Sequence, residues 1–331
     1  MGKVYLAEHT LMARRAAIKV LRGIYQEDRK MVARFINEAR AANAIHHPNI
    51  VEMIDVGYLD GGLPYLMMEY LDGETLQRRL TRVGRLPPAD AVRIIDQTAS
   101  ALEAAHAVGI IHRDLKPDNL FLVPDPAHPG GESVKVVDFG IAKLLGPELA
   151  ASIRTSGVVL GTPDYMSPEQ CRGTKVDRRT DVYALGVILY QALCGKPPFV
   201  AESQIDVMMM HVAAVPKPPR ELNPDIPPQL EAITLRALAK RPDDRFDSMS
   251  ALRQALPPPA PSATSDPAAP KPLPTVAARP VMAPVSRLLR LSPRWIWVLL
   301  ALLAGVGVSW TAASHLLGGG ARRSPPGAAA R

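Results

Sequence analysis

Composition changes abruptly at Pro257, and this break limits which part of the chain can fold around a core. From there to about Pro284 the residues are mostly Pro, Ala, Ser and Thr with few aromatics. Such a segment cannot bury enough apolar surface to offset the entropy of ordering. The residues before the break are numerous enough for one large domain or two modest ones. We therefore expect a folded domain at 1–255 and a disordered Pro/Ala-rich linker at 256–286.

The charge of the chain is unevenly distributed. There are 39 Lys and Arg against 32 Asp and Glu, a formal net charge of +7. Residues 256–331 hold eight of the basic residues and one of the acidic ones, so the expected domain is neutral. Its net charge gives no support for nucleic-acid binding. The two cysteines, Cys171 and Cys194, have no Cys-x-x-Cys spacing, which argues against a zinc site or a disulfide framework.

Strand patterns are concentrated early in the domain and helical patterns later. Short apolar runs typical of strands occupy 1–7, 15–21, 51–58 and 63–70, with a helical pattern at 29–45. Further helical patterns follow at 89–108, 181–190, 205–213, 229–240 and 248–255, with short strands at 120–123 and 134–137. This order predicts an α+β fold with a small β-rich part and a large α-rich part.

One stretch between apolar runs, residues 110–119, is hard to explain as a core element. It places a carboxylate, a lysine and an amide within six residues. Asp114 can accept a proton from a hydroxyl, Lys116 can stabilise a phosphoryl group, and the Asn119 amide oxygen can bind a metal ion. A second stretch, Asp138-Phe139-Gly140, follows the strand at 134–137 and offers another oxygen ligand.

The stretch at 110–119 resembles the catalytic loop of protein kinases, in the form typical of serine/threonine kinases. The resemblance extends over nearly all of 1–255 and is to the bacterial, eukaryotic-like (Hanks-type) members. It implies a bilobal protein-kinase fold, with ATP and Mg²⁺ as cofactors, Mn²⁺ as an alternative ion, and proteins as substrates. It also implies roles for these residues: Asp114 as base, Lys116 beside the transferred charge, and Asn119 and Asp138 as metal ligands.

Four further residues receive nucleotide-binding roles from the same resemblance. Lys19, in the strand at 15–21, is implied to hold the α- and β-phosphates, and Glu38, in the helix at 29–45, to pair with it. Taken alone, Glu38 would be read as an exposed residue of a solvated helix. Backbone groups around Glu69 and Leu71 are implied to pair with adenine.

The Gly-rich loop that covers the ATP phosphates in this family is present only in its last part, as Gly2 and Val4. The first strand and two of three glycines are absent. One interpretation is that Met1 is an internal residue of a longer reading frame, and the alternative is a real truncation. The truncated loop leaves open a second function, a membrane-anchored pseudokinase-like scaffold without catalysis. A small-molecule phosphotransferase is disfavoured by the long segment that ends in Ser167-Pro168-Glu169.

The segment from Ile141 to Glu169 corresponds to the activation loop. Arg113 is implied to bind a phosphorylated residue of this loop, which predicts autophosphorylation at Thr155 or Ser156, in trans within a homodimer. Thr162 is implied to orient Asp114 and the substrate hydroxyl. The resemblance also implies that Glu169 pairs with Arg245 and that Asp181 holds amides of the catalytic loop.

The C-terminal part contains a predicted membrane span. Residues 295–317 include no Asp, Glu, Lys or Arg, and as a helix they would extend roughly 35 Å at about 1.5 Å per residue, enough for a bilayer core of about 30 Å. A buried soluble helix is the alternative, but the preceding linker leaves no core to receive it. We expect a basic juxtamembrane segment at 287–294, a single-pass anchor in the cell (inner) membrane, a cytoplasmic kinase domain and a short extracytoplasmic tail at 318–331.

Overall fold

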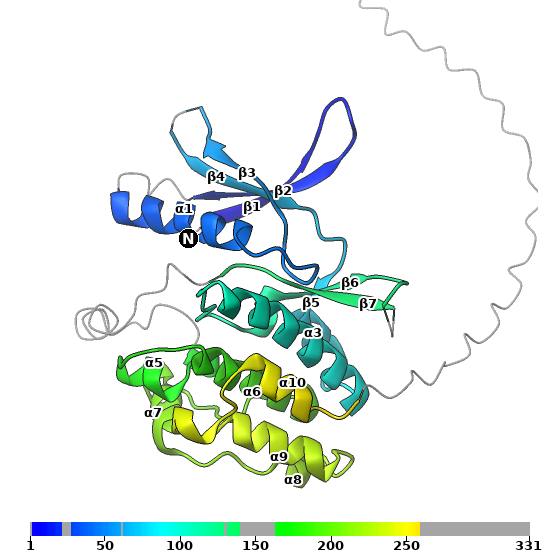
Figure 1. Cartoon of the computed structure of the whole chain (residues 1–331), viewed down its shortest axis with the longest axis vertical. Helices are drawn as coiled ribbons and strands as arrows, with labels where there is room; N and C mark the ends of the chain where they lie inside the picture. Colours follow the sequence, from blue (N-terminus) through cyan, green and yellow to red (C-terminus); the bar gives the residue numbers. More distant parts are fainter. Residues whose placement is uncertain (1, 22–27, 61, 129–130, 140–162, 259–331) are drawn as a thin grey trace, which may run out of the picture. The chain divides into compact units, whose positions relative to one another are not determined.

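The structure is a computed structural model, and it describes residues 2–21, 28–60, 62–128, 131–139 and 163–258. This part of the chain has two lobes, a β-rich lobe with one helix and a larger lobe made mostly of helices (Figure 1). The predicted α+β bilobal fold is confirmed. The predicted juxtamembrane segment, membrane span and tail lie outside the described residues, as does the linker beyond Pro258.

Across the described residues, no helix is both long and apolar enough to cross a membrane.

The small lobe is an antiparallel sheet in the order β1-β2-β4-β3, with a single helix packed on it. Phe35 and Ala39 of the helix are buried against Leu21 and Leu66 of the sheet. Because β2 pairs with β1 on one side and β4 on the other, its residue Lys19 lies on an inner strand. The elements are β1 (Gly2–Glu8), β2 (Arg15–Leu21), α1 (Arg29–Asn43), β3 (Met53–Tyr58) and β4 (Pro64–Glu69).

The large lobe combines a short sheet, in the order β5-β6-β7, with the remaining helices (Figure 1). The strands are β5 (Glu74–Thr75), β6 (Leu120–Pro124) and β7 (Glu132–Val136). The helices are α2 (Leu76–Val83), α3 (Pro88–Ala107), α5 (Pro168–Arg172), α6 (Arg179–Cys194), α7 (Gln204–Ala213), α8 (Pro219–Leu222), α9 (Pro228–Ala237) and α10 (Met249–Ala255). Short 3-10 turns are η2 (Pro117–Asn119), η3 (Pro163–Tyr165) and η4 (Pro242–Asp244).

Capping residues set where several helices of the large lobe begin. The Ser167 hydroxyl accepts a hydrogen bond from Gln170 N, and the Gln170 side chain accepts one from Ser167 N. This reciprocal pair satisfies two amides that a helix start leaves open. The hydroxyls of Ser203 and Ser248 cap α7 and α10 by accepting hydrogen bonds from Ile205 N and Ala251 N, respectively. Ser167 thus has a structural role at the start of α5.

Helix α6 forms the centre of the large lobe. All but the two residues at its ends are buried, as its pattern of apolar residues predicts. Gly186 permits its close approach to α9, because a Cβ at this position would lie 2.7 Å from Ala237 Cβ. The first turn of α6 carries Asp181 into the interior, where it meets the segment that contains Asp114.

Candidate active site

The loop between α3 and η2 is held by one buried carboxylate. His112 N and Arg113 N donate hydrogen bonds of 2.9 Å to Asp181 Oδ2 and Oδ1. His106 Nε2 of α3 lies 2.7 Å from Asp181 Oδ2. Burial alone would raise the pKa of Asp181, but the contact with His106 holds it below its ordinary value. Asp181 is therefore ionised, which strengthens its hydrogen bonds to the loop amides.

Three of the residues predicted to act in phosphoryl transfer lie together in this loop. Lys116 Nζ is 3.4 Å from Asp114 Oδ2, and Asn119 Nδ2 donates to the Asp114 carbonyl oxygen at 2.9 Å. The side chains of Asp114 and Lys116 are each 24% exposed, so both are open to a substrate. The loop thus presents a carboxylate and an ammonium group on a backbone that Asn119 fixes.

The two lobes meet at an ion pair that the sequence did not indicate. Lys19 Nζ of β2 lies 2.7 Å from Asp138 Oδ1, just after β7. The lysine side chain is 10% exposed and the aspartate side chain 44%. Glu38, the partner implied by the resemblance, has a side chain that lies outside the described part of the structure.

The oxygen atoms of Asn119 and Asp138 suit a hard divalent cation. Because the Asn119 amide nitrogen is used by the Asp114 carbonyl, its Oδ1 remains as an acceptor. Val137 N donates to Asn119 O at 2.9 Å, which brings the two predicted ligands to adjacent segments. Mg²⁺ and Mn²⁺ both prefer such oxygen donors. In the described ranges no group of three or more His, Cys, Asp and Glu could hold a metal ion.

The segment before Gly140 is fixed by an aromatic contact. The buried Phe139 ring lies 4.8 Å from the His112 ring, centroid to centroid. Burial lowers the pKa of His112, so its ring is neutral near pH 7. The neighbouring Arg113 and Asp138 have φ of 64° and 55°, in the left-handed region that is unfavourable for residues with a Cβ. Such local strain is typical of functional sites.

The predicted nucleotide contacts lie on β1 and in the connection between the lobes. Glycine is favoured at position 2, because the Cβ of any other residue would lie 2.8 Å from Val20 O. Val4 is an exposed residue of the same strand. Glu69 ends β4, and its carboxylate accepts from Lys135 Nζ at 2.7 Å. Leu71 follows in the segment that leads to β5.

The predicted regulatory residues are only partly described. Arg113 Nε is buried, and no hydrogen-bond partner for it exists among the described residues. The Arg113 carbonyl accepts from Gln170 Nε2 at 2.8 Å, which ties the loop to α5. Thr155, Ser156 and Thr162 lie outside the described residues.

A buried ion pair anchors the end of the activation segment. Arg245 Nη1 and Nη2 donate to the two oxygens of Glu169, both at 2.8 Å. Thr180 Oγ1 adds a hydrogen bond of 2.6 Å to Glu169 Oε1. Burial alone would raise the pKa of Glu169, but Arg245 holds it below its ordinary value. The structure thus brings together the two residues that the resemblance pairs.

Sequence reasoning missed two polar residues that support the site. Asn49 Nδ2 donates to Val134 O at 2.8 Å and to Gln97 Oε1 at 3.0 Å, joining the segment before β3 to β7 and α3. His106, which contacts Asp181, is the second. Its signal in the sequence was its place four residues after buried Leu102 on the apolar side of α3.

The fold has a small lobe built on a sheet, a large helical lobe and polar loops between them. This is the fold of protein kinases. The protein kinase domain model matches residues 1–256, and the chain belongs to this family.

The curated relatives are bacterial serine/threonine-protein kinases. Pkn1 of Myxococcus xanthus is 46% identical over 257 residues, which cover 77% of this chain and 36% of Pkn1. PknB of Mycolicibacterium smegmatis is 42% identical over 259 residues, 77% of this chain and 40% of PknB. The chain therefore spans less than half the length of these relatives. The crystal structure of the Mycobacterium tuberculosis PknI kinase domain matches with a TM-score of 0.59 and 29% identity, over 77% of this chain and 90% of that one.

Proposed function

We propose that this chain is a serine/threonine protein kinase that transfers the γ-phosphoryl group of ATP to protein Ser or Thr hydroxyls. The observation that carries the proposal is the placement of Asp114 and Lys116 on a loop fixed by Asp181. The curated relatives, which are serine/threonine-protein kinases, support the proposal. Lys116 supports it too, because a lysine after the Asp-Leu pair is typical of serine/threonine kinases.

The proposed chemistry assigns each polar group a separate task. Asp114 accepts the proton of the substrate hydroxyl. At the same time the hydroxyl oxygen bonds to the γ-phosphorus, and ADP leaves. Lys116 stabilises the negative charge on the transferred group, and Lys19 holds the α- and β-phosphates. Asn119 and Asp138 would hold Mg²⁺, which neutralises phosphate charge when bound. Most of the rate enhancement then comes from positioning and fixed charges.

The decisive experiment is autophosphorylation with radiolabelled ATP. Asp114→Asn removes the proton acceptor while keeping its size, so we expect at least a roughly 100-fold loss of rate. Asp118→Asn is the matched control, because Asp118 is an exposed carboxylate of the same loop, and it should retain activity. Full activity of Asp114→Asn would refute the assignment. No incorporation by the unaltered chain would favour the scaffold function instead.

Regulation by activation-loop phosphorylation is part of the proposal. Arg113 has a buried Nε that lacks a hydrogen-bond partner in the described part of the chain, and a phosphate on Thr155 or Ser156 would supply an acceptor. A homodimer would allow this transfer in trans, and Thr162 would orient Asp114 and the substrate hydroxyl. Mass spectrometry of active protein should find phosphate on Thr155 or Ser156, and an active chain modified at neither residue would contradict the scheme.

Membrane tethering by residues 295–317 completes the proposed function. The kinase domain needs cytosolic ATP, so it would lie in the cytoplasm, with the C-terminal tail outside. The proposed tether is supported by the run of residues 295–317, which has no charged side chain and follows three arginines. In sealed cell-derived vesicles of known orientation, the kinase domain should be protected from protease only when the cytoplasmic face is inside. Recovery of the full chain in the soluble fraction would contradict the tether.

A further inference from the structure

The described part of the chain ends inside a groove on α3, which its last two residues, Pro257 and Pro258, help to line. We infer that the residues that follow, Pro259-Ala260-Pro261, continue in this groove and dock in its apolar half. The start of the linker would then be attached to the large lobe. This attachment is independent of the proposed kinase function, and it can be tested without measuring activity.

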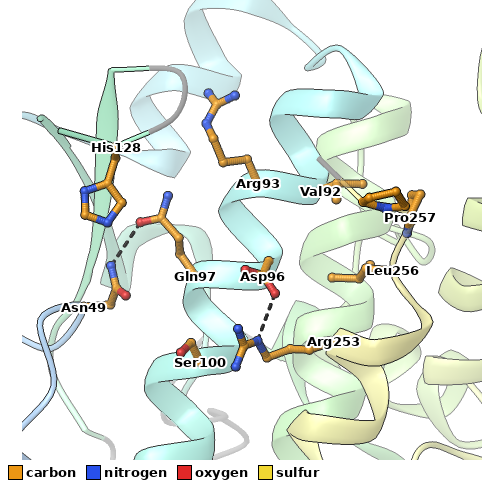
Figure 2. Close-up of a pocket in the computed structure, with 11 residues that line it drawn as sticks. Asn49, Val92, Arg93, Asp96, Gln97, Ser100, His128, Arg253, Leu256 and Pro257 are labelled. Carbon is orange, nitrogen blue, oxygen red and sulfur yellow. Dashed lines mark hydrogen bonds and ion pairs between the residues drawn. The ribbon is translucent and has the colours of Figure 1, made fainter. Parts of the chain in front are cut away.

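The groove consists of two neighbouring cavities of about 360 and 380 Å³. Val92, Pro257 and Pro258 line both of them. Figure 2 shows the first cavity, which extends across α3 from His128 on one side to Leu256 on the other. The end of the described chain therefore lies where the two halves of the groove meet.

The charges in the first half of the groove are already paired. Its lining residues with a full charge are Arg93 and Arg253 against Asp96. Arg253 lies 2.9 Å from Asp96, and Arg93 lies 2.7 Å from Asp90. This half therefore does not favour a charged ligand of either sign.

The second half of the groove has only apolar side chains. Besides the two prolines at the end of the described chain, it is lined by Pro87, Pro88, Ala89, Val92, Pro227 and Leu230. Val92 and Leu230 are buried parts of the core, whereas the other four are half-buried or exposed. An apolar occupant would be stabilised here because it removes apolar surface from water. A charged group would lose water without gaining a partner from these side chains.

The chain approaches the apolar half as it leaves α10. Arg253 of α10 contacts Asp96 in the middle of α3, and the later Pro258 lines a cavity with Ala89 in the first turn of α3. The segment therefore runs antiparallel to α3, towards its start. Three further residues in polyproline form extend roughly 9 Å at about 3.1 Å each, which matches the width of a cavity of this size.

The composition of the segment suits burial without a helix or strand. Four of the five residues 257–261 are prolines, and a proline has no backbone N–H group that needs an acceptor. Among these five residues only Ala260 brings such a donor, whereas an ordinary segment would bury several at a cost in free energy. Proline also has little backbone freedom to lose when it is ordered.

Docking at this position would fix where the linker leaves the domain. The apolar half lies at the first turn of α3, whereas the last turn of this 20-residue helix leads into the catalytic loop. The two ends of the helix are roughly 30 Å apart at about 1.5 Å per residue. The free part of the linker would begin at Ser262, away from Asp114 and from a substrate bound there.

Thiol labelling of the purified full-length chain tests the position of the segment. Ala260→Cys should react with a maleimide about tenfold more slowly than Ala268→Cys, when each rate is divided by its value in concentrated urea. Peptide mapping separates the new thiol from Cys171 and Cys194. Equal protection of the two positions would overturn the inference, since the linker would then leave the groove at Pro258.

Two substitutions at opposite ends of α3 test whether the apolar half is the docking site. Ala89→Arg adds bulk and charge at an exposed lining position, and it should remove the protection of the thiol at position 260. Ala107→Arg is the matched control, because Ala107 is exposed at the last turn and lines neither cavity. Protection that survives Ala89→Arg would contradict docking in this half. Protection that rises with protein concentration would assign the groove to a second copy and also overturn the inference.

Thermal unfolding of the full-length chain gives a readout without an added thiol. Ala260→Asp places a charge in the apolar half, so we expect the Tm to fall by about 2 to 4 °C. Ala268→Asp makes the same change further along the linker and should leave the Tm unaltered. Equal Tm values in the two variants would show that the segment does not pack on the large lobe.

Discussion

Lys19 Nζ lies 2.7 Å from Asp138 Oδ1, which joins the small-lobe sheet to a proposed magnesium ligand of the large lobe. In this arrangement each group neutralises the charge of the other. Nucleotide with Mg²⁺ would offer phosphates to the lysine and a cation to the aspartate, so binding exchanges both partners.

Replacing Lys19 should therefore affect catalysis far more than folding. We expect Lys19→Met to lower autophosphorylation at least about 100-fold, because the phosphates lose their positioning charge. Stability should change by only about 1 kcal/mol, because Asp138 is open to water. Lys135→Met is the matched control, a lysine with an equally short ion pair to Glu69, and should remain active. Urea unfolding and initial rates measure both effects.

The buried pair of Glu169 and Arg245 should show the opposite balance. Arg245→Met leaves a carboxylate buried without its counter-charge, and we expect a loss of about 3 to 5 kcal/mol in the free energy of unfolding. The variant that also carries Glu169→Leu should recover much of this loss. Chemical denaturation of the two single variants and the double variant gives the coupling energy. Strict additivity would show that the pair does not act as a unit.

The contact between α6 and α9 predicts a specific steric cost. Gly186→Ala places a Cβ only 2.7 Å from Ala237 Cβ, so we expect a loss of about 1 to 3 kcal/mol in the free energy of unfolding. Ala237→Gly in the same chain should restore part of the stability. Thermal unfolding of the two single variants and the double variant tests this. A Gly186→Ala chain as stable as the unaltered one would show that the helices separate freely.

Acidification should destabilise the large lobe through His211. Burial and the nearby charge of Lys240 lower the pKa of His211 to about 4, from 6.5. The unfolded chain therefore binds more protons between these values, so stability is complete above about pH 6.5 and falls towards pH 4. His211→Gln should be less stable near pH 7 but lose about 2 kcal/mol less between about pH 7 and pH 5.

Urea unfolding at the two pH values measures this difference. Met209→Gln is the control, because Met209 is an exposed residue of the same helix without a titratable group, and it should leave the pH dependence unchanged. An unchanged pH dependence in His211→Gln would assign the acid sensitivity to other groups.

The sequence was informative where chemistry and periodicity are local. The bounds of α3 and α7 were predicted to within one residue, because Pro88 and the apolar spacing mark them. Asp114, Lys116 and Asn119 were found together because they lie within six residues. Helix α9 ends at Ala237, three residues before the predicted end at Lys240, because the apolar pattern continues past the last helical turn.

Contacts between distant segments could not be derived in the same way. The pairing of Lys19 with Asp138, 119 positions later in the chain, depends on how the two lobes meet. Likewise, the sequence assigned no role to the polar residues of α3. Only the placement of Leu256 and His128 beside this helix makes it one wall of a groove.

The attachment of the catalytic loop to Asp181 has a consequence for genetics. Because the amides of His112 and Arg113 take their position from the first turn of α6, an error in the packing of that helix displaces the loop as well. Substitutions such as those at Val187 or Leu189, deep in the core, should then appear in a screen for lost activity beside changes at Asp114. The position of an inactivating allele would not reveal whether it acts on chemistry or on the scaffold beneath it.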